Sequence, residues 1–419
     1  MRRVYVILIS AAFLMMITGE TLFAGEVDIL VDKLVEKGIL SPVEAQIILD
    51  ETKQEVAKDL AQGKSYALPD WVQRTKLKGD LRLRYQYDDK DLNSVSGRNR
   101  ERVRFRLGIE SKVNDQWKIA AGLASGSSDP RSTNQTLQDT FSTKGLNLDY
   151  MYAQYTAAPW LSVIGGKMER KPILWEPTDL LWDGDINPEG AVLALSKGMG
   201  GIDLFMNTGF FVIDESSSKS KEPWMSYVQP GLKWEIGEDV SLKAAATYYY
   251  IDSKGYDIDN SANTNSLSGA NHKYNYDSIS PALELGIKKP LGGIVPYCGL
   301  FGEYVNAFDP ENDNDGYAAG FKFGDKKVKD KGKWQAKYIY RRLERDAWLD
   351  ALPDSDAYDG DTNVKGHEIV FEYGLAKNVI FGLDYYYMEP IKTLTGVSDH
   401  SLGSNNSQQV LQADVVMKF

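Results

Sequence analysis

Residues 77–87 read LKGDLRLRYQY, and residues 100–110 read RERVRFRLGIE. Apolar and polar side chains alternate along both stretches, and successive side chains of a β-strand point to opposite faces. The two stretches therefore predict an antiparallel hairpin with one apolar wall and one basic wall. A soluble sandwich would bury the apolar wall against a second sheet, whereas a membrane barrel would turn it toward lipid and turn the basic wall toward a wet lumen. We call the basic side chains the arginine ladder; they are Arg82, Arg84, Arg100, Arg102, Arg104 and Arg106.

The composition is compatible with both kinds of β-protein. The chain of 419 residues has a formal net charge of -11 and contains 24 Tyr, 9 Trp and 37 Gly, residue types that strands and tight turns use. Its mean hydropathy is -0.38, and beyond the N-terminus no apolar run approaches the ~20 residues of a membrane-spanning helix. Hydropathy alone would indicate a soluble protein, but the alternating strands of a membrane barrel also average to a polar sequence.

The N-terminus predicts export from the cytoplasm. Arg2 and Arg3 precede an apolar segment, and Ala24 is a small residue at a suitable cleavage point. This pattern predicts a signal peptide over residues 1–24, cleaved near Ala24. The alternative is an uncleaved anchor, for which the apolar segment is short. The single cysteine, Cys298, excludes an internal disulfide framework, and export without disulfides fits a bacterial envelope protein.

The next segments differ from the rest of the chain. Residues 25–65 predict two short amphipathic helices in the periplasm, the second beginning at Ser41-Pro42 with an N-cap and a first-turn proline. An apolar stripe on such helices needs a partner surface. They would pack on the periplasmic end of a barrel, associate between subunits as a short coiled coil, or form a semi-ordered spacer. Residues 66–76 predict a linker and residues 77–419 a barrel.

The region that begins at residue 77 predicts sixteen strands, and its connections alternate between short and long. Short periplasmic turns and longer external loops are typical of outer-membrane barrels, and an even strand count places both ends on the periplasmic side. We therefore predict an all-β transmembrane fold, a 16-stranded antiparallel up-and-down β-barrel with a short N-terminal periplasmic helical region. The predicted strands are 77–87, 100–113, 117–126, 147–156, 161–168, 189–196, 202–212, 223–235, 240–251, 278–288, 294–306, 317–325, 332–343, 365–374, 379–388 and 408–419.

The last predicted strand supports the barrel. Leu411, Ala413, Val415, Met417 and Phe419 share one face of it, and the chain ends on the aromatic side chain. A terminal Phe on an alternating strand resembles the signal by which outer-membrane barrels are recognised for insertion. Phe419 is therefore our candidate membrane-insertion signal, and the barrel-assembly machinery is its expected partner.

Several segments carry a family resemblance. Residues 148–155 read LDYMYAQY, residues 165–168 read GGKM and residues 180–190 read LLWDGDINPEG. They resemble the putative porin family of Gram-negative outer membranes, to which GDLRLRY at 79–85 and DGDTN at 359–363 are also similar. The resemblance spans nearly the whole mature chain. It implies an outer-membrane diffusion pore for ions and small hydrophilic solutes, assembled as a homotrimer, and it implies no particular substrate.

The third long loop, residues 169–188, is the candidate pore-constricting loop. Trp175 and Trp182 would anchor it, and three prolines would stiffen it. If it folds inward, its carboxylates face the arginine ladder and create a transverse field across the lumen. Alternatively, they neutralise the ladder. The ladder favours anions and the net acidity favours cations, so the ion preference stays open. The constriction-loop acids are Glu169, Glu176, Asp179, Asp183 and Asp185.

Enzyme chemistry finds little support in the sequence. His272, His367 and His400 fall in or beside different external loops, without zinc-site spacing, and there is no G-x-S-x-G elbow, P-loop or Rossmann fingerprint. A barrel hydrolase would need a Ser–His pair, and we expect its one candidate, His367, on the lipid or interface side. We therefore predict no enzyme activity, no metal and no cofactor. The alternative functions are a secreted soluble β-protein that binds glycans and an outer-membrane barrel hydrolase.

Two loops are rich in acids, residues 309–316 and 344–361. We expect solvated, repelling loop surfaces there, with a divalent ion bridging them to lipopolysaccharide phosphates as the alternative. Lipid and lipopolysaccharide are the expected partners of the barrel surface. Nucleic acid is not expected, because the protein is exported and acidic and its basic residues alternate with aliphatic ones.

Overall fold

The structure is a computed structural model of the chain. It divides into two units, residues 1–73 and residues 74–419, each of which is described by itself. The predicted signal peptide with Ala24, residues 62–65 of the predicted helical region, residues 66–69 of the predicted linker, and His400 lie outside the described residues. The described residues are 31, 33–37, 39–61, 70–90, 97–215, 222–394 and 406–419.

The first unit contains a helix with a reciprocal cap. Helix α3 (Pro42–Ala61) begins directly after Ser41, and α4 (Asp70–Gln73) is a single turn. The Glu44 N–H donates to the Ser41 hydroxyl over 3.3 Å, and the Ser41 N–H donates to the Glu44 carboxylate over 2.8 Å. Each side chain thus satisfies a backbone group at the helix start, as in a capping box. Among the described residues, no helix has both the length and the apolar character needed to cross a membrane.

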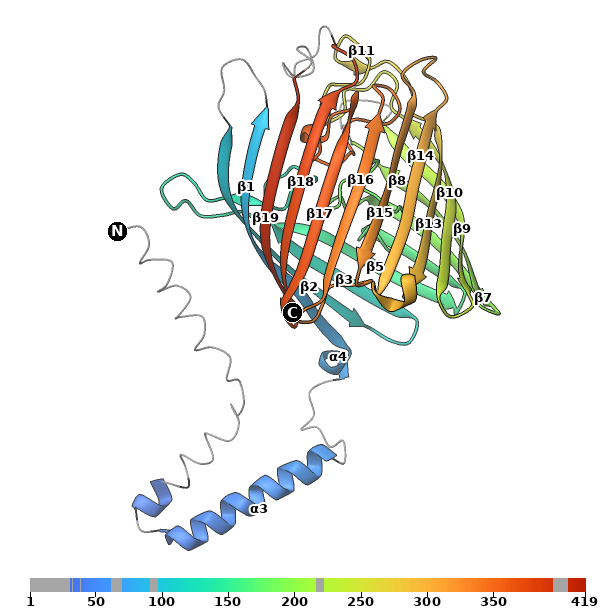
Figure 1. The fold of residues 1–419 in the computed structure, drawn as a ribbon. Helices are drawn as coiled ribbons and strands as arrows, with labels where there is room; N and C mark the ends of the chain where they lie inside the picture. The colour runs from blue at the N-terminus through green and yellow to red at the C-terminus, as the bar shows by residue number, and fades with distance from the viewer. Residues whose placement is uncertain are drawn as a thin grey trace. The chain divides into compact units, whose positions relative to one another are not determined.

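The second unit is a closed antiparallel barrel of sixteen strands (Figure 1), as predicted. Each barrel strand pairs with its neighbours in sequence, and β19 pairs with β1 to complete the circle. Closure removes the sheet edges that would otherwise template aggregation. The barrel strands are β1 (Thr75–Lys90), β2 (Arg98–Lys112), β3 (Trp117–Ser125), β5 (Leu146–Ala158), β6 (Leu161–Lys167), β7 (Glu189–Met199), β8 (Ile202–Val212), β9 (Trp224–Ile236), β10 (Val240–Asp252), β13 (Ser278–Lys288), β14 (Tyr297–Ala307), β15 (Asp315–Gly324), β16 (Trp334–Leu343), β17 (Val364–Ala376), β18 (Val379–Pro390) and β19 (Gln408–Lys418).

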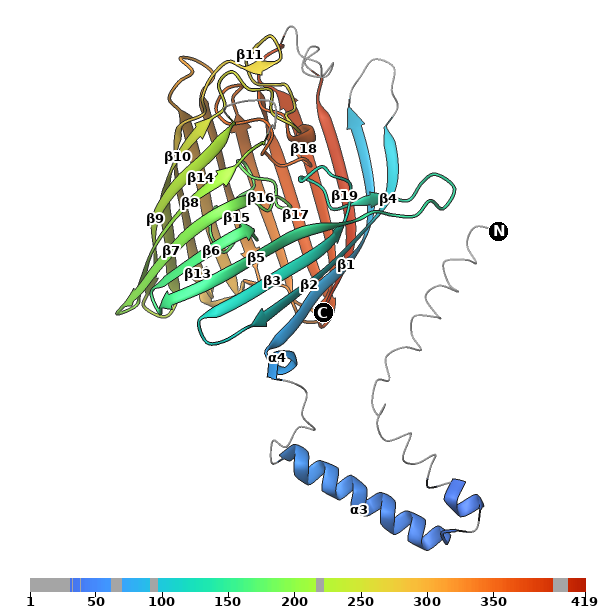
Figure 2. The same cartoon turned by 180° about the vertical axis from the view of Figure 1, so that it is seen from behind.

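Three two-residue strands and two 3-10 turns lie in the connections. Strand β4 (Gln135–Thr136) pairs with β2, and β11 (Leu267–Ser268) pairs with β12 (Asn271–His272) at the long-loop end of the barrel (Figures 1 and 2). The turns are Leu291–Gly293 and Tyr358–Gly360. Such short elements leave no periodic signal in a sequence, which is why they were not predicted.

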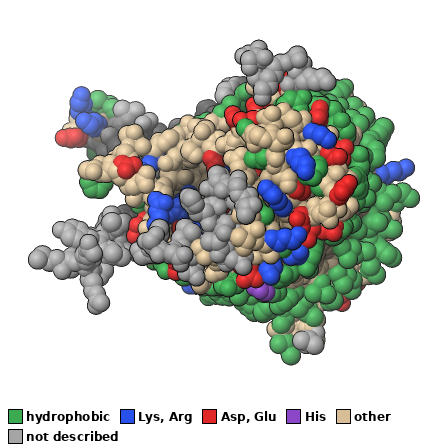
Figure 3. Space-filling model, turned by 90° about the horizontal axis from the view of Figure 1, so that it is seen from above, with side chains coloured by type: hydrophobic (Ala, Val, Ile, Leu, Met, Phe, Trp, Pro, Cys, Tyr) green, Lys and Arg blue, Asp and Glu red, His purple; other side chains and the backbone are tan. Residues whose placement is uncertain are grey.

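The two faces of each strand meet different surroundings. On β1 and β2 the apolar wall points outward, with Leu77 66% and Leu83 48% exposed, while Arg84 and Arg104 are 6% and 7% exposed. Seen from the long-loop end, hydrophobic side chains cover the barrel's outer wall and charged ones gather over the loops (Figure 3). A soluble sandwich would show the reverse arrangement, so the apolar wall is the lipid-facing one.

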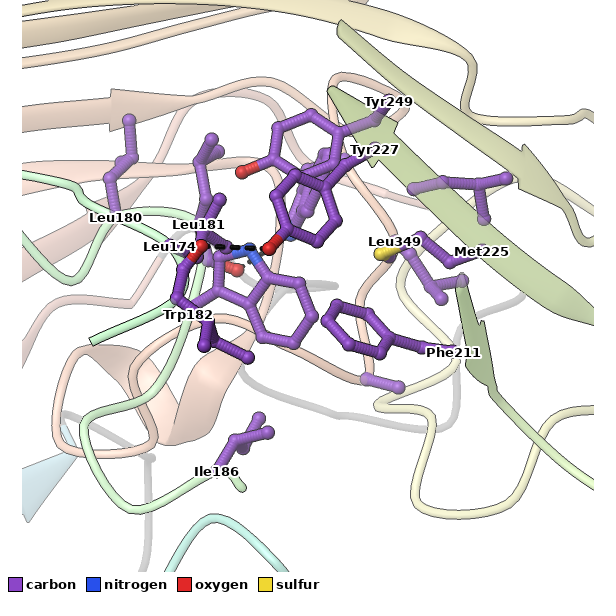
Figure 4. Close-up of a cluster of buried hydrophobic side chains, with 14 of the residues drawn as sticks. Leu174, Leu180, Leu181, Trp182, Ile186, Phe211, Met225, Tyr227, Tyr249 and Leu349 are labelled. Carbon is purple, nitrogen blue, oxygen red and sulfur yellow. Dashed lines mark hydrogen bonds between the residues drawn. The ribbon is translucent and has the colours of Figure 1, made fainter. Parts of the chain in front are cut away.

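Two long loops fold into the lumen and build an apolar core there. We call residues 169–188 the inner loop and residues 344–363 the acidic loop. Their apolar side chains are buried against inward-facing side chains of β8, β9 and β10 (Figure 4). The cluster, which we call the loop core, includes Ile173, Leu174, Leu180, Leu181, Trp182, Ile186, Phe211, Met225, Tyr227, Tyr249, Trp348 and Leu349.

The expectation of a solvated surface on the acidic loop is wrong. Asp350 is 0% exposed and Asp346 is 3% exposed. The Asp350 carboxylate accepts hydrogen bonds from the N–H groups of Thr264 and Asn265 at 2.7 and 2.9 Å, and Asp346 accepts one from the N–H of Ser266 at 2.7 Å. Backbone donors of the loop between β10 and β13 thus replace water around these carboxylates.

Candidate functional site

The arginine ladder lies on the inner face of β1 and β2. In the register of this hairpin Arg82 is directly opposite Arg104, and Arg84 is directly opposite Arg102. Like charges in directly opposed positions destabilise a sheet, so the ladder requires acidic partners nearby.

Most of those partners are acids of the barrel strands themselves. Asp80 lies 2.8 Å from both the Arg104 and the Arg106 guanidinium. Asp414 of β19 lies 2.7 Å from Arg84, with a second hydrogen bond of 2.8 Å. The sequence analysis assigned these acids no role, although both could have been predicted. Asp80 lies two residues before Arg82, so its side chain points to the same face of β1. Asp414 lies on the last strand, which barrel closure places beside β1.

The remaining ladder arginines have mixed partners. Arg100 lies 2.6 Å from Asp88. Arg102 donates to the Gln86 side-chain oxygen over 3.0 Å. Arg82 donates to Asn134 over 2.6 Å, and Arg84 adds a 3.4 Å contact with Asp356 of the acidic loop. The ladder is therefore held by polar groups from neighbouring strands and from two connections.

Of the five inner-loop acids, Asp185 is the one that forms an ion pair with the ladder among the described residues. Its carboxylate lies 3.5 Å from the Arg106 guanidinium and accepts hydrogen bonds from Thr133 through the N–H at 3.1 Å and the hydroxyl at 2.9 Å. Burial raises the pKa of Asp185, but the positive field of Arg104 and Arg106 outweighs burial and holds that pKa below its usual value. Asp185 therefore stays ionised beside the ladder.

The other four acids contact different groups. Glu169 lies 2.6 Å from Lys78, Glu176 lies 2.9 Å from Arg170, and Asp179 lies 2.7 Å from Arg341. The Asp183 carboxylate accepts the N–H groups of Ser355 and Asp185, both at 2.8 Å. The inner loop is thus tied to several walls of the barrel at once.

Burial sets the protonation of two of these acids. It raises the pKa of Glu176 to about 7, although the nearby Arg170 opposes the shift. Burial and the adjacent Asp185 carboxylate raise the pKa of Asp183 to about 7. Both groups therefore carry a partial charge near neutral pH.

The two tryptophans of the inner loop fix it against the wall. The Trp175 backbone exchanges two hydrogen bonds with the Gln229 side chain, at 2.9 and 2.8 Å, and the Lys243 ammonium lies 4.4 Å from the Trp175 ring centre. Trp182 is 3% exposed, and the Trp348 indole donates to the Leu181 carbonyl over 2.6 Å. These contacts make the inner loop a fixed part of the lumen.

A second charged cluster, which the sequence did not suggest, surrounds Arg341 of β16. Its guanidinium lies 2.7 Å from Asp179 of the inner loop and 3.0 Å from Asp354 of the acidic loop, and it also contacts Glu368 of β17. Lys337 lies 3.2 Å from Glu368. This cluster joins both inward-folded loops to β16 and β17.

Two cavities wide enough to admit water border the inner loop. One cavity of about 510 Å³ is lined by Asp80, Arg106, Glu169 and Lys171 among others. A second, of about 290 Å³, is lined by Lys171, Trp175, Asp179 and Lys337 among others. Both cavities share Arg170, Lys171 and Gly184. Charged linings on both sides of a fixed loop are the arrangement expected of a constriction.

Neither described histidine lies in an arrangement typical of a metal site or a catalytic site. His272 lies 3.4 Å from Asp350 in the buried contact between two loops. His367 is exposed on the outer face of β17, where it lies 2.7 Å from the Tyr338 hydroxyl. Within the described part of the chain, no group of three or more His, Cys, Asp or Glu side chains is placed to hold a metal ion.

Comparison with known proteins identifies the family. The model of the family described as "Putative porin" matches residues 38–91, 90–286 and 269–419. The chain belongs to this family. No curated protein matches the chain.

Solved structures share the porin fold. The high-pH structure of OprB from Pseudomonas putida has 12% sequence identity and a TM-score of 0.56, and the match covers 83% of this chain and 95% of that one. A variant of the Rh. blastica porin has 11% identity and a TM-score of 0.44, with 82% of this chain and 100% of that one covered. This porin is an outer-membrane channel for the passive diffusion of ions and small hydrophilic solutes, and its family and fold point to a channel rather than an enzyme.

Proposed function

We propose that solutes cross this porin beside the inner loop, and that the loop and the arginine ladder together form the narrowest part of the path. The observation that carries the proposal is the ion pair between Asp185 and Arg106, which brings the inner loop to the ladder wall at 3.5 Å. The two cavities that share Lys171 and Gly184 support a path along the same loop.

The charges at this constriction come in pairs. Most ladder arginines have a carboxylate of the same wall within ion-pair distance, so the net charge stays small, while Asp185 supplies a negative charge from the inner loop and directs part of the field across the lumen. A transverse field of this kind orients water and dipolar solutes and favours small polar ones. The pore-lining basic residues of the proposal are Arg82, Arg84, Arg100, Arg102, Arg104 and Arg106, and the acidic ones are Glu169, Glu176, Asp179, Asp183 and Asp185.

We further propose partners for the outside of the barrel and for the rest of the chain. The apolar outer wall contacts outer-membrane lipid and the external loops contact lipopolysaccharide. The strand that ends at Phe419 is read by the barrel-assembly machinery, and the exposed outward position of this side chain supports that role. The mature chain begins after cleavage near Ala24, residues 25–65 form a periplasmic region, residues 66–76 link it to the barrel, and three copies assemble as a homotrimer.

Cysteine accessibility tests the path. A Cβ at Gly184 meets nothing within 4 Å, so a Gly184→Cys variant in a Cys298→Ser background should fold. In a planar bilayer we expect stepwise conductance, and a charged thiol reagent should reduce each step. Ser142→Cys on an exposed loop is the matched control and should not respond. An unaffected Gly184→Cys channel would move the path away from the inner loop.

Assembly is tested separately. Light scattering in detergent should give the protein mass of three copies. A single-copy mass from a preparation that conducts would reject the homotrimer and leave the channel intact.

A further inference from the structure

One short-turn connection differs from the others in its charge. Residues 325–333, between β15 and β16, read DKKVKDKGK and carry five lysines. We call this segment the lysine turn. It lies at the end of the barrel that carries the short turns, which in outer-membrane barrels faces the periplasm.

The lysine turn is fixed across the ends of β17 and β18. The Asn378 N–H donates to the Lys329 carbonyl over 2.8 Å, and Gly374 exchanges hydrogen bonds of 2.9 and 2.8 Å with Gly332 and Lys333. Val328 is buried. Gly374 lies on the same, lumen-facing side of β17 as Glu368. A Cβ built on Gly374 would lie 2.0 Å from the Asp330 carbonyl oxygen. The turn therefore bends over the lumen side of its neighbours instead of extending along the strand direction.

A cavity of about 530 Å³ lies beneath this turn. Four lysines line it, together with Gln335, Glu372 and Phe419 among others. The lining thus contains four lysines and one acidic side chain, Glu372. The lysines are Lys326, Lys327, Lys329 and Lys418.

Local acids do not balance these lysines. Asp325 of the turn is occupied by the Lys333 ammonium at 3.0 Å and by the Trp334 N–H at 3.0 Å. The structure gives no ion pair to any of the four lysines within its described residues. Lys326 instead lies over the Tyr297 ring, 5.6 Å from its centre. The cavity therefore holds a net positive charge.

The ladder differs in this respect. Arg84, Arg100, Arg104 and Arg106 each have a carboxylate within 2.8 Å. Paired charges produce short-ranged fields, whereas an unbalanced charge at a narrow mouth attracts counter-ions from a distance. The larger unpaired charge therefore lies at the mouth and not at the ladder.

We propose that the lysine turn forms an anion-binding vestibule at the periplasmic mouth, which gives the channel a preference for small anions such as phosphate and carboxylates. This inference rests on the proposed diffusion function and names the solute class for it. Lysine ammonium groups are strongly hydrated and exposed here, so the vestibule concentrates anions without holding them tightly.

Reversal potentials in a KCl gradient test the inference. We expect the wild-type porin to prefer chloride, and the Lys326→Gln, Lys327→Gln, Lys329→Gln triple variant to lower the chloride-to-potassium permeability ratio by about threefold or more at low salt. The effect should fade toward 1 M KCl, where the Debye length is only ~3 Å. The corresponding triple Lys→Arg variant retains the charge and should keep the wild-type ratio.

A matched control removes the same charge elsewhere. Lys197 near the end of β7, and Lys289 and Lys377 on other short-turn connections, are exposed, and their replacement by Gln should leave the ratio unchanged. Inorganic phosphate, added to each compartment in turn, should reduce chloride current from one side in the wild type and from neither side in the triple variant.

The outcomes separate the two proposals. Heat-modifiable gel migration first shows that each variant is folded. Each of the three single Lys→Gln variants should lower the chloride-to-potassium permeability ratio by a smaller amount than the triple variant. A cation-preferring wild type, or a folded triple variant with an unchanged ratio, would overturn the vestibule while the channel stands. Folded wild-type protein without stepwise conductance would instead overturn the proposed diffusion function.

Discussion

The carboxylate of Asp185 lies 3.5 Å from the guanidinium of Arg106 and joins the inner loop to the barrel wall. Asp80 holds the same guanidinium at 2.8 Å from within its own hairpin. Arg106 is thus shared between a strand acid and a loop acid. A change at either acid alters the field at the point where the loop meets the wall.

Asp185→Asn should shift ion selectivity toward anions. The substitution removes one negative charge beside the ladder, while the amide oxygen can still accept the hydrogen bonds from Thr133. We expect the chloride-to-potassium permeability ratio to rise by roughly twofold, measured as a reversal potential in a KCl gradient. Asp129→Asn, at an acid outside the ladder, is the control. An unchanged ratio in the folded variant would remove Asp185 from the ion path.

Arg102→Glu combined with Arg104→Glu should shift selectivity toward cations. Two inward charges are reversed, and the new carboxylate at 104 faces Asp80 without a partner. The reversal potential should move toward that of potassium. Lys197→Glu near the end of β7, combined with Lys289→Glu on a short turn, changes the net charge equally at exposed positions and should have no such effect. If both double variants behave alike, the ladder does not line the path.

Trp182→Ala should loosen the inner loop without opening the barrel. Trp182 packs between Phe211 and Trp348, with ring centres 6.5 and 6.3 Å away. Removal of a buried Trp costs about 3–5 kcal/mol, and the strand hydrogen bonds are unaffected. We expect noisier and larger conductance steps from protein that keeps its heat-modifiable migration. Trp160→Ala, at a half-exposed turn position, should give steps like those of the wild type.

The contact between His272 and Asp350 should make the long-loop end pH-dependent. Burial lowers the pKa of His272, but hydrogen bonding and attraction to Asp350 outweigh burial, so the pKa lies above its ordinary value. Burial raises the pKa of Asp350, but His272 outweighs it and the pKa is lowered. Asp257 adds to the field on His272, and Tyr276 contacts its ring edge-on.

The sign of the dependence follows from linkage. A raised histidine pKa contributes stability that is fully present below the unfolded value of 6.5 and is lost as pH rises through the folded pKa. Amide hydrogen exchange in the two loops should therefore quicken as pH rises from 6 to about 8, after correction for intrinsic rates. His272→Gln should remove this increment, and His367→Gln on the outer face should retain it. Equal corrected rates at both pH values would contradict the assignment.

The strands could be predicted because successive side chains face lipid and lumen in turn, which imposes an alternation of apolar and polar residues. Leu83 meets lipid and Arg84 meets the lumen, and this alternation is local enough to read from the sequence. Loop lengths then gave the up-and-down order. The same alternation predicts that the side chains of Asp80 and Asp414, the strand partners of the ladder, point into the lumen.

The loop arrangement was beyond such reasoning. Asp350 binds the Thr264 backbone far away in sequence, and nothing periodic marks that contact. An isolated stretch of aspartates resembles a solvated loop, because its donors come from elsewhere in the chain. The cluster around Arg341 has the same origin, since its three carboxylates come from two loops and one strand. Long-range polar contacts of this kind need the folded structure.

The pairing of β1 with β19 has a consequence for the order of assembly. Gly79 and Phe419 exchange two backbone hydrogen bonds of 3.0 Å, and a Cβ on Gly79 would lie 2.4 Å from both the Phe419 ring and the Arg106 carbonyl. Almost the whole barrel separates these residues in sequence, so joining them carries the largest loop-closure entropy of any strand pair. The seam can form only after the last strand has been delivered, and until then both edge strands stay open to wrong partners. Closure is thus the final step in building the barrel.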